Sequence, residues 1–174
     1  SRIIGVGLTK PATKTLTTAT ELMQQALESA LANAGMRLRQ LDGLVAVPSL
    51  SEPRFMEAHY LATRMGLLPQ KNVVMRTIDT GGAGPISGLI EADLMIRQQG
   101  LDLVAVVAGD AVCSLPSADF LARADAGCRN PDGSSVSPVI PTSYDRVARW
   151  QIDTGSVTRE QLAMISVLMS RQAL

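Results

Sequence analysis

The chain has few aromatic residues and no net charge, and both shortages exclude classes of function. Aromatic residues make up 3% of its 174 residues, too few for a surface on which nucleic-acid bases stack. Lysine plus arginine and aspartate plus glutamate both number 16, so the formal charge is zero and favours neither nucleic acid nor an anionic membrane as a partner. No apolar run approaches the roughly 20 residues that a membrane-spanning helix needs. We therefore expect no nucleic-acid partner and no membrane span.

Cysteine and histidine are scarce as well, which argues against a disulfide framework and a metal site. The two cysteines, Cys113 and Cys128, form no CxxC motif, and no residues have the spacing of zinc ligands. Cys128, beside Arg129 in a polar stretch, is interpreted as an incidental thiol. The single histidine, His59, lies among apolar residues and is interpreted as structural. An intracellular setting is expected, the cytoplasm or an organelle if a leader was lost, since the chain opens on Ser1.

What the chain does contain is an alternation of apolar runs and helical patterns. With 46% hydrophobic and 18% charged residues, the composition is that of a folded globular protein. The runs expected to be strands are residues 3–8, 44–47, 73–75 and 103–108. The helices expected between them run from a capping box at 18–21 to Gly35, from 54 to 65 and from 86 to 99. This order predicts an α/β fold, a mostly parallel sheet with helices on both faces.

The amino-acid composition changes after Gly109, where serine, proline, glycine and aspartate become frequent. We expect residues 1–112 to form the α/β domain and residues 113–174 to form a long excursion followed by helices. The expected helices of this part are residues 118–126, 144–153, and a last one that begins at the capping box 158–161.

A glycine-rich stretch between the third apolar run and the next helix is the most informative feature. It consists of Gly81, Gly82, Ala83 and Gly84, hereafter the glycine turn. Glycine lets a backbone approach a ligand, and the first N–H groups of a helix have no internal partners and favour negative charge. No side chain of the turn is a nucleophile. The turn therefore predicts a site that binds an oxyanion or acyl thioester, with Gly82 and Ala83 N–H as donors, unless its glycines serve only packing.

Two other patterns have simpler explanations than a functional site. Gly5 and Gly7 match a nucleotide-binding fingerprint poorly, because Lys10 stands where its third glycine belongs. Asp79 and Asp110 follow strands at the same edge of the expected sheet and could form a carboxylate pair. Helix capping or a backbone hydrogen bond is the preferred interpretation of both aspartates.

The order of these features resembles the N-terminal half of the thiolase superfamily, closest to the sterol-carrier-protein type of thiolase. Residues 3–10 resemble the family's opening strand, and residues 21–45 its "AL-x-x-AG…iD-x-v" segment. Residues 108–114 resemble its "GG-x-E-x-MS" strand end, and residues 144–150 with 158–161 resemble its paired loop-domain helices. The resemblance implies a thiolase-like layered fold, of which this chain carries the N-terminal half only. A further strand is then expected to cover the exposed edge of the sheet.

The resemblance also implies a chemistry, acyl transfer between coenzyme A thioesters through an acylated cysteine. The position of that cysteine falls on Gly82, and Cys113 falls where the family has a non-catalytic methionine. The nucleophile position is thus vacant, and thiolase activity is expected to be absent or very low. What remains is a thiolase-like protein of acyl-CoA and lipid metabolism, an acetyl-CoA acyltransferase homologue. It would bind a coenzyme A thioester at Gly81, Gly82, Ala83 and Gly84 and would need no other cofactor.

Two alternatives stay open. One is a cysteine-free thiolase-like aldolase that cleaves a β-hydroxyacyl-CoA with a steroid or aromatic side chain, alongside an OB-fold partner, with its base in the missing half. The other is a non-catalytic subunit that binds acyl-CoA or lipid. The resemblance further implies a homodimer through Val73, Val74 and Met75, since a short apolar edge strand is better paired than exposed to water.

Overall fold

The computed structural model describes residues 1–12, 16–128, 132, 134 and 137–173. These residues fall into two compact units, Ser1–Pro116 and Ser117–Leu174. The first unit holds the sheet and the glycine turn, and the second consists of helices. The change in amino-acid composition predicts a boundary between residues 112 and 113.

The described residues of the first unit form a parallel sheet of three strands in the order β2-β1-β3. The strands are β1 (Gly43–Val47), β2 (Val74–Thr77) and β3 (Val104–Ala108). Gly43 pairs with Val74 on one side and with Val104 on the other. The central strand β1 is buried along its whole length, which explains its unbroken apolar run. The predicted parallel α/β architecture is confirmed, with β2 reaching two residues beyond its predicted end.

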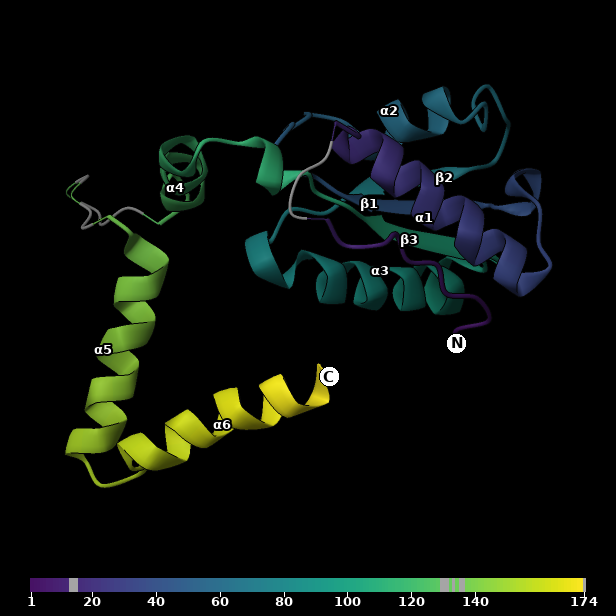
Figure 1. Cartoon of the computed structure of the whole chain (residues 1–174). Coiled ribbons are helices and arrows are strands. Elements are labelled where there is room, and N and C mark those ends of the chain that lie inside the picture. Colours follow the sequence, from purple (N-terminus) through teal and green to yellow (C-terminus); the bar gives the residue numbers. More distant parts are fainter. Residues whose placement is uncertain (13–15, 129–131, 133, 135–136, 174) are drawn as a thin grey trace. The chain divides into compact units, whose positions relative to one another are not determined.

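Helices cover both faces of this sheet (Figure 1). The helices are α1 (Ala19–Ala34) and α2 (Glu57–Arg64) on one face and α3 (Gly84–Gln99) on the other. Side chains of β1 alternate between the two faces, as the pleat of a strand requires. Leu44 and Ala46 join the cluster under α1 and α2, whereas Val45 packs with Ala92 and Met95 of α3.

The ends of the helices follow local signals to different degrees. Thr18 and Glu21 form the predicted capping box, and Gly35 ends α1 in the left-handed conformation at φ 66°. α2 begins three residues later than predicted, at Glu57, because the preceding loop is longer. α3 begins two residues earlier than predicted and takes in Pro85, whose missing N–H is not needed in a first helical turn.

The predicted strand at residues 3–8 was wrong. Residues 3–8 belong to no strand among the described residues, and Val6 N–H donates to the Asn33 side chain at 3.0 Å. A Cβ on Gly5 would lie 2.4 Å from Ala30 O, and one on Gly7 would lie 2.1 Å from Ala26 O. The segment therefore lies directly on the backbone of α1. Together with α1, α3 and β3, the segment lines a groove of about 980 Å³.

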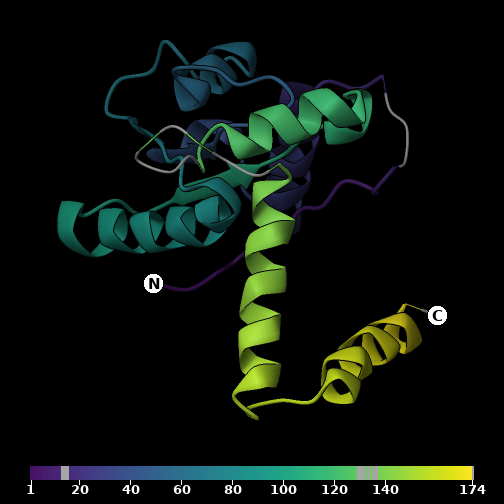
Figure 2. The same cartoon turned by 90° about the vertical axis from the view of Figure 1, so that its left-hand side faces the viewer.

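The second unit contains three helices within its described residues. They are α4 (Ser117–Asp125), α5 (Val139–Asp153) and α6 (Arg159–Gln172). Figure 2 shows α5 leading through a short turn into α6. Thr158 and Gln161 form the second predicted capping box, and Val139 N–H donates to Asp125 at 2.9 Å, which ties the start of α5 to the end of α4. α5 begins five residues before its predicted start. In the described part of the chain no helix has the length and apolar character needed to cross a membrane.

Candidate functional site

The glycine turn lies where the sequence predicts, between β2 and α3. Gly81–Ala83 form a single 3-10 turn, and α3 starts at the next residue. Gly81 adopts φ 56°, a conformation that side-chain-bearing residues rarely take. Thr80 and Ser87 lie on either side of the turn, with their hydroxyl oxygens 2.8 Å apart. The methyl group of Ala83 is the only side chain that the turn itself presents.

Most backbone donors of the turn are already used. Gly81 N–H donates to the Asp79 carboxylate at 3.2 Å, Ala83 N–H donates to Thr80 O at 3.2 Å, and Gly84 N–H donates to Gly81 O. Gly82 N–H makes no hydrogen bond within the described part of the chain. Gly82 is therefore the one donor of the turn left for a ligand, whereas Ala83, the second predicted donor, is engaged.

Gly82 also has room for a side chain. A Cβ built on Gly82 meets no atom within 4 Å, and its backbone is not left-handed. Other glycines of this region differ, because a Cβ on Gly84 would lie 2.5 Å from Val47 and one on Gly88 would lie 2.9 Å from Val106. Those two glycines let α3 approach the sheet closely. Nothing in the described fold requires a glycine at position 82.

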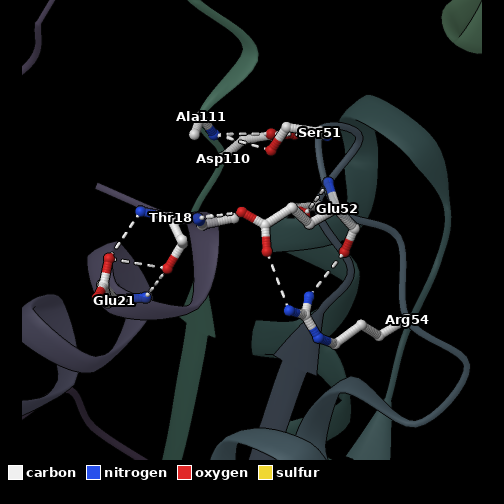
Figure 3. Close-up of polar contacts among 9 residues, drawn as sticks. Thr18, Glu21, Ser51, Glu52, Arg54, Asp110 and Ala111 are labelled. Carbon is white, nitrogen blue, oxygen red and sulfur yellow. Dashed lines mark hydrogen bonds and ion pairs between the residues drawn. The ribbon is translucent and has the colours of Figure 1, made fainter. Parts of the chain in front are cut away.

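The loop that follows β1 lies at the carboxyl ends of the strands, as the glycine turn does. It is held there by Asp110 (Figure 3). The Asp110 carboxylate accepts hydrogen bonds from Leu50 N–H at 2.6 Å, Ser51 N–H at 3.0 Å and Ala111 N–H at 2.8 Å. Ser51 Oγ accepts a second bond from Ala111 N–H at 3.2 Å. Asp110 and Asp79 thus both bind backbone N–H groups, which confirms the preferred interpretation of these two aspartates.

Glu52 connects this loop to α1 and to Arg54 (Figure 3). Ala19 N–H donates to one Glu52 carboxylate oxygen at 3.3 Å, and the Arg54 guanidinium donates to the other at 3.0 Å. Arg54 also lies over the ring of Tyr60, with its guanidinium carbon 4.2 Å from the ring centroid. The loop therefore reaches the first turn of α2 with its backbone and its charged side chains held in place.

Glu57, the first residue of α2, is a buried carboxylate that the sequence analysis missed. Its exposed fraction is 1%, and neither carboxylate oxygen has a hydrogen-bond partner among the described residues. Burial raises the pKa of Glu57 above its ordinary value, with Arg54 opposing the shift and Glu52 adding to it. One signal was available, because Glu57 stands four residues before Leu61 on the buried side of α2.

Hydrogen bonding places Glu57 at the strand that leads into the glycine turn. The next residue, Ala58, donates its N–H to Thr77 Oγ1 at 3.1 Å, and Thr77 is the last residue of β2. The first turn of α2 and the glycine turn thus both adjoin the carboxyl end of β2. Ligands of open parallel sheets bind at this edge.

The two cysteines and the histidine are exposed side chains. Cys113 is exposed in a 3-10 turn after β3 (Val112–Ser114), and Cys128 is exposed as well. His59 is exposed on α2. Arg129 lies outside the described residues. In the described ranges no group of three His, Cys, Asp or Glu side chains is placed to hold a metal ion.

Comparison with known proteins supports the fold. No protein-family model matches the chain, and no curated protein matches it significantly. Xanthomonas campestris OleA H285N with cerulenin matches 68% of this chain and 35% of its own, with a TM-score of 0.52 and 17% identity. Cerulenin-bound OleA matches 63% of this chain and 36% of its own, with a TM-score of 0.51 and 16% identity.

A different enzyme matches a smaller part of the chain, with a lower TM-score. 3-Oxoacyl-[acyl-carrier-protein] synthase III from Aquifex aeolicus VF5 matches 56% of this chain and 31% of its own, with a TM-score of 0.49 and 24% identity. The chain spans about a third of the length of these solved structures. Over the part that matches the two OleA structures, the small parallel sheet with helices on both faces has their thiolase-like fold.

Proposed function

We propose that this chain is a thiolase-like protein of acyl-CoA and lipid metabolism that binds a coenzyme A thioester at the glycine turn, with the acyl carbonyl on Gly82 N–H. The observation that carries the proposal is the combination found at Gly82, a free backbone donor beside space for a side chain that the fold does not require. OleA supports the ligand class by analogy, because it was solved with bound lauric acid and lauroyl-CoA.

The proposed chemistry follows from the donor being a backbone group. A backbone N–H beside a helix N-terminus stabilises negative charge that develops on a carbonyl oxygen. In enzymes that use such a donor, losing it costs about 3 kcal/mol of transition-state stabilisation. The donor survives whether residue 82 is cysteine or glycine, whereas covalent acyl transfer requires the thiolate. Ligand binding is therefore retained at this turn and thiolase activity is absent or very low.

The finer features that the family resemblance implies remain part of the proposal. They are the likeness to the sterol-carrier-protein type of thiolase and a homodimer through Val73, Val74 and Met75. The position of β2 at an edge of the described sheet supports such a dimer, because an edge strand presents unpaired backbone groups to a partner strand. A homodimer would continue the sheet across two copies of the chain.

A specific observation favours the aldolase alternative. An aldolase needs a proton-transferring group in place of the cysteine, and Glu57, at the carboxyl end of β2, is a buried carboxylate with no partner among the described residues. The OB-fold partner belongs to this alternative. The non-catalytic subunit would use the Gly82 donor alone, without proton transfer.

Replacing Gly82 with valine tests the binding site. The open space predicts that Gly82→Val folds normally, while its side chain fills the place of the acyl carbonyl. We expect the affinity of the full-length protein for acetoacetyl-CoA, measured by calorimetry, to fall at least about tenfold, or about 1.4 kcal/mol. Gly127→Val is the matched control, since a Cβ on Gly127 also meets nothing within 4 Å at a backbone that is not left-handed. Unchanged affinity in Gly82→Val would show that the turn serves packing only.

Gly82→Cys is the companion test. We expect acetoacetyl-CoA to acylate the new thiol, with peptide mapping by mass spectrometry placing the acyl group on residue 82. The wild-type protein should remain unacylated. An acyl group on Cys113 of the wild type would show that the vacant position was assigned wrongly.

A further inference from the structure

Glu57 is buried without any hydrogen bond that would offset the loss of its contacts with water, among the described residues. Other carboxylates of the same unit have backbone partners: Asp110 accepts three N–H groups and Asp42 accepts those of Asp102 and Leu103. A carboxylate near a helix N-terminus need not be buried, because Glu21 caps α1 while partly exposed. Glu57 is buried with both oxygens unpartnered among the described residues. A buried polar group in that state is explained by a ligand or a water molecule that completes its hydrogen bonds.

The contacts of α2 place Glu57 at the edge of the sheet from which the glycine turn starts. Ala58, Leu61 and Ala62 are fully buried and face the sheet, and Glu57 extends this buried side to the first residue of the helix. The bond from Ala58 N–H to Thr77 holds that end of α2 at the carboxyl end of β2. The glycine turn begins four residues after Thr77. An acyl group held at the turn would therefore occupy the same edge of the sheet.

The chemistry of a carboxylate narrows the kind of ligand. The ionised form of Glu57, which burial disfavours, only accepts hydrogen bonds, so a group that stabilises this form must be a donor. An unsubstituted acyl chain carries no donor near its thioester, and a β-keto group carries only an acceptor. A β-hydroxyl group is a donor, and it lies two carbons from the thioester carbonyl.

We propose that Glu57 accepts a hydrogen bond from the β-hydroxyl group of a 3-hydroxyacyl thioester and so determines which acyl-CoA ligands this site prefers. The inference rests on the proposed function, because it assumes that the thioester carbonyl lies at Gly82. Glu57 acts here as a specificity-determining residue. Gly82 N–H holds the carbonyl that all acyl-CoA ligands share, and Glu57 recognises the substituent in which they differ.

The test compares ligands that differ only at the β-carbon. Dissociation constants of 3-hydroxybutyryl-CoA (both enantiomers), acetoacetyl-CoA and butyryl-CoA are measured for the full-length wild type, Glu57→Gln and Glu57→Met. The wild type should bind one 3-hydroxybutyryl-CoA enantiomer at least tenfold more tightly than butyryl-CoA. Glu57→Met should lose that preference while its butyryl-CoA affinity stays the same, and Glu57→Gln should retain part of the preference. Glu28→Gln, an exposed carboxylate on α1, is the control and should behave as the wild type.

The possible results separate this inference from the proposed function. If none of the ligands binds the wild type, both fail. If the ligands bind equally, if the wild type prefers acetoacetyl-CoA, or if the preference survives Glu57→Met, the assignment of Glu57 is overturned and a buried water is its partner. Thermal unfolding provides a check without ligand. The midpoint should rise in Glu57→Met, since an unpartnered carboxylate is replaced by an apolar side chain. A fall in both variants would show that Glu57 supports the fold, and would also overturn the inference.

Discussion

Residues 5–7 and the glycine turn are both rich in glycine, yet the fold uses the two segments in opposite ways. Gly5 and Gly7 lie so close to α1 that a Cβ on either would overlap backbone atoms, at 2.4 and 2.1 Å. Gly82 faces open space, with nothing within 4 Å of a Cβ. A glycine-rich sequence therefore does not by itself distinguish packing from function, whereas the space around each glycine does.

Two carboxylates at the carboxyl ends of the strands also differ in whether the fold accounts for them. Asp110 accepts three backbone N–H groups and is explained by the fold. Glu57 is buried and, in the described structure, accepts none. Gly82 and Glu57 are thus both positions for which the described packing supplies no reason. We expect substitutions to sort the four positions into those that the fold needs and those that it tolerates.

Gly7→Ala should have the largest effect. The new Cβ would lie 2.1 Å from Ala26 O and 2.4 Å from Ala30 N, both backbone atoms of a helix that cannot yield locally. We expect a loss of about 3 kcal/mol in the free energy of unfolding, measured with urea, since overpacking costs typically 1–3 kcal/mol and occasionally more. Hydrogen exchange should show residues 3–8 released from α1. Gly127→Ala, where a Cβ meets open space, is the control. Normal stability in Gly7→Ala would mean that the segment does not rest on α1.

Asp110→Ala should come next. It removes the acceptor of three backbone N–H groups, and a hydrogen bond to a charged group contributes about 1.5–3 kcal/mol. Because the loop at Leu50 can reach water, we expect a net loss of about 2 kcal/mol in urea unfolding, with faster amide exchange at Leu50 and Ser51. Asp102→Ala, which removes an exposed carboxylate, is the control. Unchanged exchange at both amides would contradict the anchoring role of Asp110.

Glu57→Gln should change stability in the opposite direction and with a definite pH dependence. The folded protein holds the pKa of Glu57 above the ordinary 4.5, so the fold disfavours the ionised form. That penalty is absent below the unfolded pKa and grows as the pH rises towards and through the folded pKa. Replacing the carboxylate with a neutral amide removes it. We expect the variant to be more stable than the wild type by about 1 kcal/mol at pH 7. The gap should close as the pH falls below about 4.5.

The measurement for Glu57→Gln is urea unfolding at a series of pH values from acid to neutral. Arg54 and Glu52 are the charged neighbours that modulate the shift, so both stay unchanged in these variants. A stability difference that is independent of pH, or one that favours the wild type at neutral pH, would contradict the buried and unpartnered state of this carboxylate.

Gly82→Ala should have the smallest effect on stability. Its Cβ has open space and a compatible backbone, so the main consequence is a less flexible unfolded chain, worth about 0.5 kcal/mol in favour of the variant. Urea unfolding of Gly82→Ala beside Gly7→Ala measures the contrast between the two segments directly. If Gly82→Ala lowered the free energy of unfolding as much as Gly7→Ala, both glycines would be required by packing.

Features of the fold that depend on neighbours in the sequence were predictable. Thr18 caps α1 through Glu21 three residues later, and Gly35 and Gly100 end their helices in the left-handed conformation. The apolar runs of β1 and β3 reflect burial between layers of helices. The segment at residues 3–8 has the same apolar character, but a strand also needs a partner at hydrogen-bonding distance, and that is a property of the whole fold.

The candidate site also combines features that depend on sequence neighbours with features that depend on the whole fold. The glycine turn was predictable because its composition marks a tight connection between a strand and a helix. Which N–H group of the turn remains free could not be predicted. The 3-10 geometry, in which Ala83 N–H is bonded and Gly82 N–H is not, depends on backbone angles. Glu57 was missed because its burial depends on the path of the preceding loop. That loop is held by Asp110, a residue far along the chain.

The open space at Gly82 has an evolutionary consequence. A glycine codon ending in T or C becomes a cysteine codon by a single base change, and a Cβ at this position meets no atom within 4 Å. Under the proposed function, one base change is therefore enough to remove or restore the thiol at this position.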